Sequence, residues 1–273
     1  MKLADSHALV TGASRGIGAT IARELHRRGA KLTLLARDQA KLEELADELG
    51  GANVLSADLL DRGQLETVIA RAEEQGGPVD ILVNNAGMDE SGLFWDLTAD
   101  GLRRLVELNV LAGMELSRQV LPGMVERNSG RIVNMASVAA IGVFPGLAAY
   151  SSTKAAVSHF SAGLRADLRG LSVGVTNVQV GFVPTEMLGN IMEYAPVVHA
   201  RRRFDKMMLL PETTAENLAA AIADAIEKDR RHVLRPGRLA GFAFLTEAPR
   251  RITDLLLGGV PPREEKTTET SEP

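Results

Sequence analysis

Tyr150 and Lys154 stand four residues apart in the segment AYSSTKAAV, residues 149–157, which otherwise consists mainly of small side chains. Residues at this spacing share one face of an α-helix, so the two side chains can lie next to each other. A tyrosine hydroxyl beside an ammonium group can serve as a proton donor whose acidity the charge tunes. The alternative is an ordinary helix with a polar edge, because this spacing also arises by chance. The pair by itself leaves both interpretations open.

Composition narrows the class of protein. The 273-residue chain is 45% hydrophobic, enough for one large α/β domain or two small ones. Its formal net charge of −4 creates no basic field that would attract nucleic acid. The chain has no cysteine, which excludes disulfides and thiol-bound metals. Its five histidines form no HExxH pair, so we expect no catalytic metal.

The sequence shows the pattern of neither a signal peptide nor a transmembrane helix. The N-terminal segment MKLADSHALVTG lacks the long apolar centre of a signal peptide. No uninterrupted apolar stretch reaches the roughly 18 residues expected of a transmembrane helix. We therefore expect a cytoplasmic protein without an integral membrane segment.

Short apolar runs alternate with helical patterns along the chain. We expect strands over residues 7–11, 31–36, 53–57, 79–85, 131–137 and 172–180. We expect helices over residues 17–28, 38–49, 62–74, 98–126 and 150–168. This alternation predicts βαβ units and a doubly wound parallel sheet of the α/β class, with helices on both faces.

A glycine-rich segment, TGASRGIG at residues 11–18, joins the first predicted strand to the first predicted helix. In this context the backbone can approach a pyrophosphate at the positive end of the helix. Gly12 allows a tight turn, and Gly16 and Gly18 allow close approach. The alternative is a plain β–α turn. The motif predicts a dinucleotide site, with contacts from Gly12, Ser14, Arg15, Gly16, Ile17 and Gly18.

The second predicted strand ends in LLAR, so Ala36 and then Arg37 stand where dinucleotide-binding folds often place an acid for the ribose hydroxyls. A carboxylate would repel a 2′-phosphate, whereas an arginine can bind it with two hydrogen bonds. Arg15 in the glycine loop could reach the same group. We therefore expect NADP(H) in preference to NAD(H). The alternative is that both arginines are solvated, and the neighbouring Asp38 weakens their field.

Two further segments follow predicted strands. Asp58 could meet an adenine edge through its side chain, with Leu59 supplying a backbone contact, or it could simply be an acid before a helix. The motif NNAG closes the fourth strand, at the edge where open parallel sheets bind ligands. Its small residues would let the chain pass close to a cofactor, although it could also be only a turn. The expected contacts are Asn85, Ala86 and Gly87.

In order and spacing, TGASRGIG, NNAG, Asn109 in ELNV, Ser137 after the fifth strand and YSSTK resemble the short-chain dehydrogenase/reductase family. Ser137 precedes Tyr150 by 13 residues, and the resemblance extends over about residues 5–235. It implies a Rossmann-type sheet of about seven strands. It also implies an oxidoreductase acting on CH–OH groups by hydride transfer between a nicotinamide and an alcohol or carbonyl. The implied catalytic residues are Asn109, Ser137, Tyr150 and Lys154.

The segment after the sixth strand departs from the family pattern. Val180-Gly181 stands where Pro-Gly is frequent, which leaves the start of this loop less fixed. Thr185 matches the residue expected near the nicotinamide carboxamide, so the resemblance places Gly181, Val183 and Thr185 at the cofactor. Ala136 stands where a second serine is common.

The resemblance assigns a role to each catalytic residue. A unit charge about 4 Å from a phenolate is worth roughly 4 kcal/mol at an effective dielectric of about 20, or about 3 pKa units. We therefore expect Lys154 to bring the pKa of Tyr150 from about 10 to near 7, which makes it a reversible acid and base. Lys154 could also hold the nicotinamide ribose, and Ser137 would orient the substrate oxygen. Asn109, a poor helix former, would bind through its backbone a water that relays protons to Lys154.

The expected substrate lid, about residues 185–210, is rich in Met and Leu. Such residues pack adaptably against apolar ligands, which favours a hydrophobic ketone or secondary alcohol, lipid-like or steroid-like. They could equally pack on the protein. Residues 201–203 and Lys206 form a basic cluster in the same segment. This cluster is either solvated or a docking surface for an acidic carrier. The second choice would make the protein a reductase of 3-oxoacyl thioesters on coenzyme A or a carrier protein.

We expect a single NAD(P)-binding domain over residues 1–260, followed by a disordered polar tail over residues 261–273. The extension at residues 236–260 could cap the pocket, lie on a membrane surface or pack on a partner subunit, and we favour packing on the protein or its partner. The resemblance implies a homodimer or homotetramer paired through the helices near 98–126 and 150–168. A non-catalytic NADP(H) sensor is the alternative of another class, and the intact Ser137, Tyr150 and Lys154 argue against it.

Overall fold

Seven strands form one parallel sheet in the computed structural model, which describes residues 1–142, 144–206 and 212–237. The order across the sheet is β3-β2-β1-β4-β5-β6-β7, and every neighbouring pair is parallel. The chain order reverses beside β1, which is where open α/β sheets bind their ligands. The strands are β1 (His7–Thr11), β2 (Lys31–Ala36), β3 (Asn53–Ser56), β4 (Ile81–Asn84), β5 (Gly130–Ser137), β6 (Val173–Val180) and β7 (His232–Arg235).

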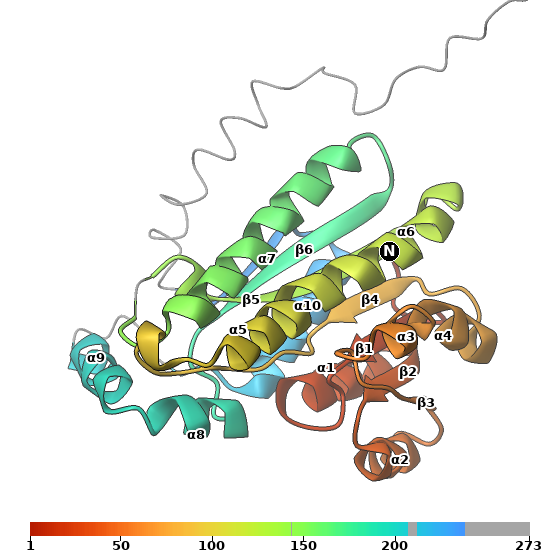
Figure 1. Cartoon of the computed structure of the whole chain (residues 1–273). Coiled ribbons are helices and arrows are strands. Elements are labelled where there is room, and N and C mark those ends of the chain that lie inside the picture. The colour runs from red at the N-terminus through yellow and green to blue at the C-terminus, as the bar shows by residue number, and fades with distance from the viewer. Residues whose placement is uncertain (143, 207–211, 238–273) are drawn as a thin grey trace, which may run out of the picture.

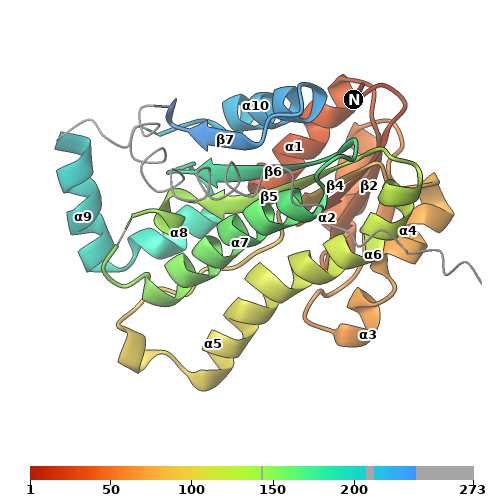
Figure 2. The ribbon, with the colours of Figure 1, turned by 90° about the horizontal axis from the view of Figure 1, so that it is seen from above.

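Helices cover both faces of this sheet (Figures 1 and 2). Helices α1 and α10 lie on one face. On the other face α5 and α6 follow one another end to end, and α7 lies beside them. Helices α8 and α9 lie together at one end of the molecule. The bounds are α1 (Gly16–Arg27), α2 (Gln39–Glu48), α3 (Arg62–Leu65), α4 (Val68–Gly76), α5 (Ala99–Val106), α6 (Ala112–Glu126), α7 (Ala148–Asp167), α8 (Glu186–Met192), α9 (Ala195–Lys206) and α10 (Ala215–Glu227). Short turns are η1 (Phe94–Asp96), η2 (Glu107–Leu111) and η3 (Val138–Ala140).

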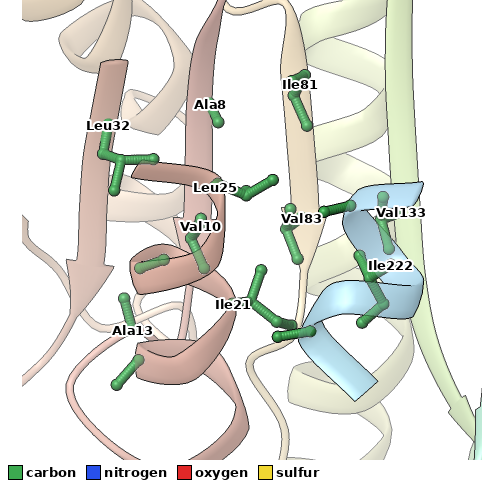
Figure 3. Packing of buried hydrophobic residues seen from close by; sticks show 14 of the residues in the cluster. Ala8, Val10, Ala13, Ile21, Leu25, Leu32, Ile81, Val83, Val133 and Ile222 are labelled. Atoms are coloured by element: carbon green, nitrogen blue, oxygen red, sulfur yellow. The ribbon is translucent and has the colours of Figure 1, made fainter. Parts of the chain in front are cut away.

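The core is divided into a cluster on each face of the sheet. On one face, Ile21 of α1 and Ile222 of α10 pack against Val10, Val83 and the neighbouring strands (Figure 3). On the other face, side chains of α4, α6 and α7 form a second cluster. Because both faces are covered, β5 and β6 are buried along their whole length. Burial of each large apolar side chain contributes about 1.5–3 kcal/mol to folding.

The expected fold class is confirmed: the chain forms a Rossmann-type parallel sheet with helices on both faces. All six strands that the sequence located are present to within a few residues. The sequence did not locate β7 or helices α8, α9 and α10. Strand β7 has only four residues among arginines and carries no strong alternation. The helix expected over residues 62–74 is divided into α3 and α4, and the one over 98–126 is interrupted by the π turn η2.

None of the helices in the described part of the chain is both long and apolar enough to cross a lipid bilayer. The cytoplasmic location stays a prediction. The expected extension from residue 238 onward, the expected tail at residues 261–273 and lid residues 207–211 lie outside the described residues.

Candidate active site

The end of β5 and the first turns of α7 bring Ser137 together with Tyr150 and Lys154, the first and last residues of the YSSTK motif. Ser137 is the last residue of β5, and Tyr150 is the third residue of α7. The two side chains form a hydrogen bond, and Ser137 Oγ also accepts a hydrogen bond from the Ala139 N–H over 3.1 Å. Ser137, Tyr150 and Lys154 are all buried. The structure therefore joins three residues that the sequence separates by up to 17 positions.

The Tyr150 hydroxyl is less acidic in this structure than the sequence suggested. Burial raises its pKa to about 12, the hydrogen bond with Ser137 lowers it, and the negative charge of Asp89 raises it further. The expected value near 7 is therefore wrong for the protein as it stands here. Lys154 Nζ lies 5.7 Å from the centre of the Tyr150 ring and does not offset the loss of solvent around the hydroxyl.

Lys154 is a buried ammonium group whose hydrogen-bond partner is a strand carbonyl. Its Nζ donates a hydrogen bond to Met135 O over 3.0 Å. Burial lowers its pKa to about 8, because the charged form loses its hydration. The side chain is thus charged at neutral pH but titrates close to it.

Asn109 lies in η2, a π turn between α5 and α6. Its Oδ1 accepts the Met88 N–H over 2.8 Å, and its Nδ2 donates to Met88 O over 2.9 Å. The same Nδ2 donates to Thr153 Oγ1 over 3.1 Å. Asn109 therefore ties the loop after β4 to α7, beside Lys154. Turns of this kind inside helices are frequent at functional sites. The water expected on its backbone stays a prediction.

The loop after β4 passes close to these groups because it is made of small residues. A Cβ on Gly87 would lie 3.0 Å from Asn109 Oδ1 and 3.6 Å from Lys154 Nζ. Asn85 instead supports the glycine loop: its Nδ2 donates to Thr11 O over 2.9 Å and to Gly12 O over 3.3 Å. The Thr11 hydroxyl accepts the N–H groups of Asn85 and Ala86, each over 2.9 Å. The sequence reading did not single out Thr11 for this role.

The glycine loop fits an anionic group. Gly12 and Gly16 have φ of 65° and 55°, which only glycine adopts readily. A Cβ on Gly18 would lie 2.1 Å from Gly12 O, so α1 approaches the turn more closely than any other residue would allow. No side chain caps the N-terminus of α1, and its first turn holds no acid. Ser14 and Arg15 precede this N-terminus and Ile17 lies in its first turn, so the predicted loop residues share one cradle suited to a pyrophosphate.

Three basic residues surround the expected adenosine end. Arg37 follows β2 directly and is exposed. The Asp38 carboxylate accepts the Lys41 N–H over 3.2 Å at the start of α2 and lies 3.4 Å from Lys41 Nζ. The hydrogen bond from the Lys41 backbone, together with the charges of Lys41 and Arg15, lowers the pKa of Asp38. Arg15 also forms a 2.6 Å ion pair with Glu186 of α8. The Asp38 charge is thus partly neutralised by Lys41.

Asp58 and Leu59 are placed by local interactions. Asp58 Oδ1 accepts the Leu60 N–H over 3.0 Å, and the Asp58 N–H donates to Gln64 Oε1 over 3.0 Å. Leu59 is buried in the cluster under α4 and α6. The geometry therefore matches an acid that orders its own loop before a helix, and contact with adenine stays a prediction.

The residues expected at the nicotinamide come from the segment after β6. The Gly181 N–H donates to Arg235 O over 2.8 Å, and a Cβ there would lie 3.0 Å from Pro236 Cδ. Val183 is buried in the core. Thr185 caps α8, and its Cγ2 lies 3.6 Å from the position of a Cβ on Gly16. Of these three, Thr185 reaches the glycine loop, whereas Gly181 is held by β7.

Asp89 is the charged residue at this site that the sequence reading missed. It is half-buried, its carboxylate forms a hydrogen bond with the side chain of Asn190 in α8, and its charge acts on Tyr150. Burial is the main reason that the pKa of Asp89 is raised. No spacing rule marks an aspartate in MDESG, because its approach to Tyr150 depends on the path of the loop.

The fold and the site define an oxidoreductase built on a dinucleotide-binding sheet, and the chain belongs to the short chain dehydrogenase family, whose model matches residues 6–195. Oxidoreductase UcpA of Salmonella typhimurium is 38% identical over 195 residues, which cover 70% of this chain and 74% of that protein.

Two solved structures share the fold over nearly their whole length. A short-chain dehydrogenase from Sphingobium yanoikuyae in complex with NADPH is 31% identical, with a TM-score of 0.77 and coverage of 97% of this chain and 99% of that one. A short chain dehydrogenase/reductase from Burkholderia phymatum in complex with NAD is 27% identical, with a TM-score of 0.76 and coverage of 94% and 96%. The family resemblance that the motifs indicated is thereby confirmed.

Replacing the buried ammonium should stabilise the protein. We expect Lys154→Met to raise the free energy of unfolding by about 1–3 kcal/mol at neutral pH, because the substitution removes a desolvated charge. The folded protein lowers the pKa of Lys154 from 10.5 to about 8, so between these values the unfolded chain binds more protons and the wild type gains stability as the pH rises. The advantage of the variant should therefore shrink across that window.

Urea unfolding of both proteins at a series of pH values measures this difference directly. A variant that is less stable than the wild type at neutral pH, or an advantage that grows with pH, would contradict the account. Ser152→Ala, on the exposed side of the same helix, is the control and should show no such pH dependence.

Proposed function

We propose that this oxidoreductase transfers a hydride between NADP(H) and a hydrophobic ketone or secondary alcohol. The observation that carries the proposal is the convergence of Ser137, Tyr150 and Lys154 at the carboxyl end of β5, beside the glycine cradle. A nicotinamide bound there would supply or accept the hydride, and the protein would handle the proton.

Each residue has a role that its surroundings support. Tyr150 would donate the proton to the substrate oxygen, since it is neutral at physiological pH. Ser137, hydrogen-bonded to Tyr150, would hold the same oxygen in place. Lys154 faces the Tyr150 ring and would stabilise the phenolate in the oxidative direction. Asn109 would hold the loop that follows β4 against helix α7, next to these three residues.

The charges near Arg37 support NADP(H) over NAD(H). Arg37 is exposed directly after β2. The neighbouring Asp38 carboxylate accepts a hydrogen bond from the Lys41 N–H at the start of α2 and forms an ion pair with Lys41 Nζ. A 2′-phosphate would therefore meet more positive than negative charge. The similar solved structures include complexes with either cofactor, so the proposal rests on these side chains.

The surroundings of Tyr150 support an apolar substrate. Phe144, Ile191 and Val197 are buried in one cluster with Tyr150. Met187 and Met192 of α8 pack against this cluster and are themselves only partly buried. One of the four basic residues of the lid is engaged within the protein, whereas Arg202, Arg203 and Lys206 are exposed. Arg201 pairs with Glu212 and stacks on Phe182, with the guanidinium 4.9 Å from the ring centre.

Removal of one hydroxyl tests the reaction class. We expect Tyr150→Phe to lower kcat for NADPH-dependent carbonyl reduction by at least about a hundredfold, because the proton donor is lost, and to leave NADPH affinity nearly unchanged. The measurement is NADPH oxidation against small aldehydes, steroid ketones and 3-oxoacyl thioesters. Tyr194→Phe is the matched control at the second tyrosine. Unchanged turnover in Tyr150→Phe would contradict the proposal. NADPH binding without turnover of any carbonyl would favour the sensor alternative, and thioesters as sole substrates would favour the 3-oxoacyl reductase.

Cofactor preference should depend on the arginine after β2. We expect Arg37→Ala to weaken NADPH binding by about tenfold or more and to change NADH binding by less than about twofold, because only NADPH carries the 2′-phosphate. Titration calorimetry with both cofactors measures the effect, and Arg62→Ala, an exposed arginine on α3, is the control. Equal losses for the two cofactors would show that Arg37 does not select the phosphate.

An apolar surface supports self-association through α5, α6 and α7. Phe94, Trp95 and Leu111 are 57%, 77% and 52% exposed, and a groove of about 530 Å³ runs between η1, α5 and α7. Exposed apolar area of this kind is typical of an interface. The proposed occupant is a second copy of the chain, which gives a homodimer or homotetramer.

A lysine in this surface should dissociate the assembly. We expect wild-type protein to have a dimer or tetramer mass in light scattering and Leu111→Lys to shift toward the monomer, because the interface would have to bury a charge. Glu44→Lys, on the exposed face of α2, introduces the same side chain elsewhere and should leave the mass unchanged. A monomeric wild-type protein would refute the assembly.

A further inference from the structure

The active site contains a carboxylate for which the proposed reaction has no use. Asp89 follows a segment whose path is tightly fixed. A Cβ on Gly87 would lie 3.6 Å from Lys154 Nζ, and both backbone groups of Met88 are bound by Asn109, over 2.8 and 2.9 Å. The next residue, Asp89, therefore follows a segment that is fixed beside Lys154 and Asn109.

The contacts of Asp89 place it on the substrate side of the site. Its carboxylate is half-buried, forms a hydrogen bond with Asn190 of α8, and acts through its charge on Tyr150. Helix α8 belongs to the segment that packs over the apolar cluster around Tyr150. The charge that acts on the pKa of Asp89 is that of Glu90, which raises it. The neighbouring Glu90 approaches α5 instead, where a Cβ on Gly101 would lie 2.9 Å from its Oε1.

A carboxylate in this place is unfavourable when only part of its acceptor capacity is used. It adds negative charge beside the hydroxyl that becomes a phenolate during alcohol oxidation. A substrate that fills the site excludes water and thereby increases the cost of leaving the remaining acceptor positions unpaired. Any donor on the substrate would reduce this second cost, and a protonated amine would also offset the negative charge. The two carboxylate oxygens offer about four acceptor positions, so a substrate donor can bind without displacing Asn190.

We propose that Asp89 determines substrate specificity by selecting molecules with a hydrogen-bond donor, a protonated amine or a hydroxyl, on a carbon next to the reacting carbon. This proposal rests on the proposed carbonyl and alcohol chemistry and narrows its substrate class. The substrate is then an apolar molecule with an α-amino or α-hydroxy ketone, or the corresponding amino alcohol or diol. The donor must be close to the reacting carbon because the segment that leads to Asp89 is fixed against Asn109 and Lys154, beside the Tyr150 that meets the reacting oxygen.

Binding of three matched ketones to the NADP⁺-loaded full-length protein tests the selection without any turnover. The probes are propiophenone and its α-hydroxy and α-amino derivatives, titrated by calorimetry. We expect both derivatives to bind about tenfold or more tightly than propiophenone, with the amine tightest, because a hydrogen bond to a charged group is stronger than one between neutral groups. Asp89→Asn should abolish the preference for the amine, retain part of the preference for the hydroxyl and leave propiophenone unchanged.

Glu90→Gln is the matched control, because it removes a carboxylate one residue away that approaches α5. The charge of Glu90 also acts on Asp89, so this variant should preserve the preference for both derivatives over propiophenone. Equal affinity of wild-type protein for the three ketones, failure of all three to bind, or a preference for the amine that survives in Asp89→Asn would overturn the proposal. If Asp89 had a merely structural role, its substitution would weaken the binding of all three ketones by the same factor. That result would also overturn the proposal.

NADPH oxidation with the same ketones separates this proposal from the one on which it rests. Reduction of propiophenone at a rate equal to that of its derivatives would overturn the role of Asp89 and leave the oxidoreductase proposal standing. We expect the ratio of kcat/KM for the amino ketone to that for propiophenone to fall by about tenfold or more in Asp89→Asn. Lack of NADPH binding by the wild-type protein would contradict the proposed function itself.

Discussion

The burial of the Lys154 ammonium beside Tyr150 is the interaction on which the arrangement of the site depends. A cation without solvent needs a partner, and Lys154 has the Met135 carbonyl at 3.0 Å. The sheet makes this partner reachable, because β4 pairs with β5 only as far as Asn134 and β5 continues to Ser137. The last three residues of β5 therefore pair with β6 but have no partner on the β4 side. This stretch contains the Met135 carbonyl that accepts from Lys154, and it ends in Ser137, whose side chain bonds Tyr150.

Close packing of backbone around this charge links the proposed catalytic groups to the proposed cofactor cradle. The loop after β4 lies near Lys154 and close against Asn109, where a Cβ on Gly87 would come within 3.0 Å of Asn109 Oδ1. Asn109 and Asn85 fasten the same loop, one to α7 and one to the turn after β1. The glycine loop and the proposed proton-transfer groups are thus parts of one hydrogen-bonded unit, although five separate segments of the chain contribute to it. The ion pair between Arg15 and Glu186 extends this unit to the start of α8.

The sequence predicted what local patterns can encode. Apolar runs located six strands, and the glycine motif in its strand–helix context located the cradle. Strand β7 was missed because four residues among arginines carry no clear period. The pKa of Tyr150 was predicted wrongly because spacing reveals a neighbouring charge but not the loss of solvent. The partner of Arg15 lies 171 residues away, and the approach of Asp89 to Tyr150 depends on a pinned loop, so neither was encoded in any short segment.

The titration of Lys154 in the free protein tests the central claim most directly. Lysine side chains labelled with isotopes can be followed by NMR as the pH rises, and the Lys154 signal is assigned by its absence from Lys154→Met. The account predicts a midpoint at about 8, well below that of the exposed lysines. A midpoint near the ordinary 10.5 would show that the ammonium is solvated, and it would remove the constraint from which the rest of the site is derived.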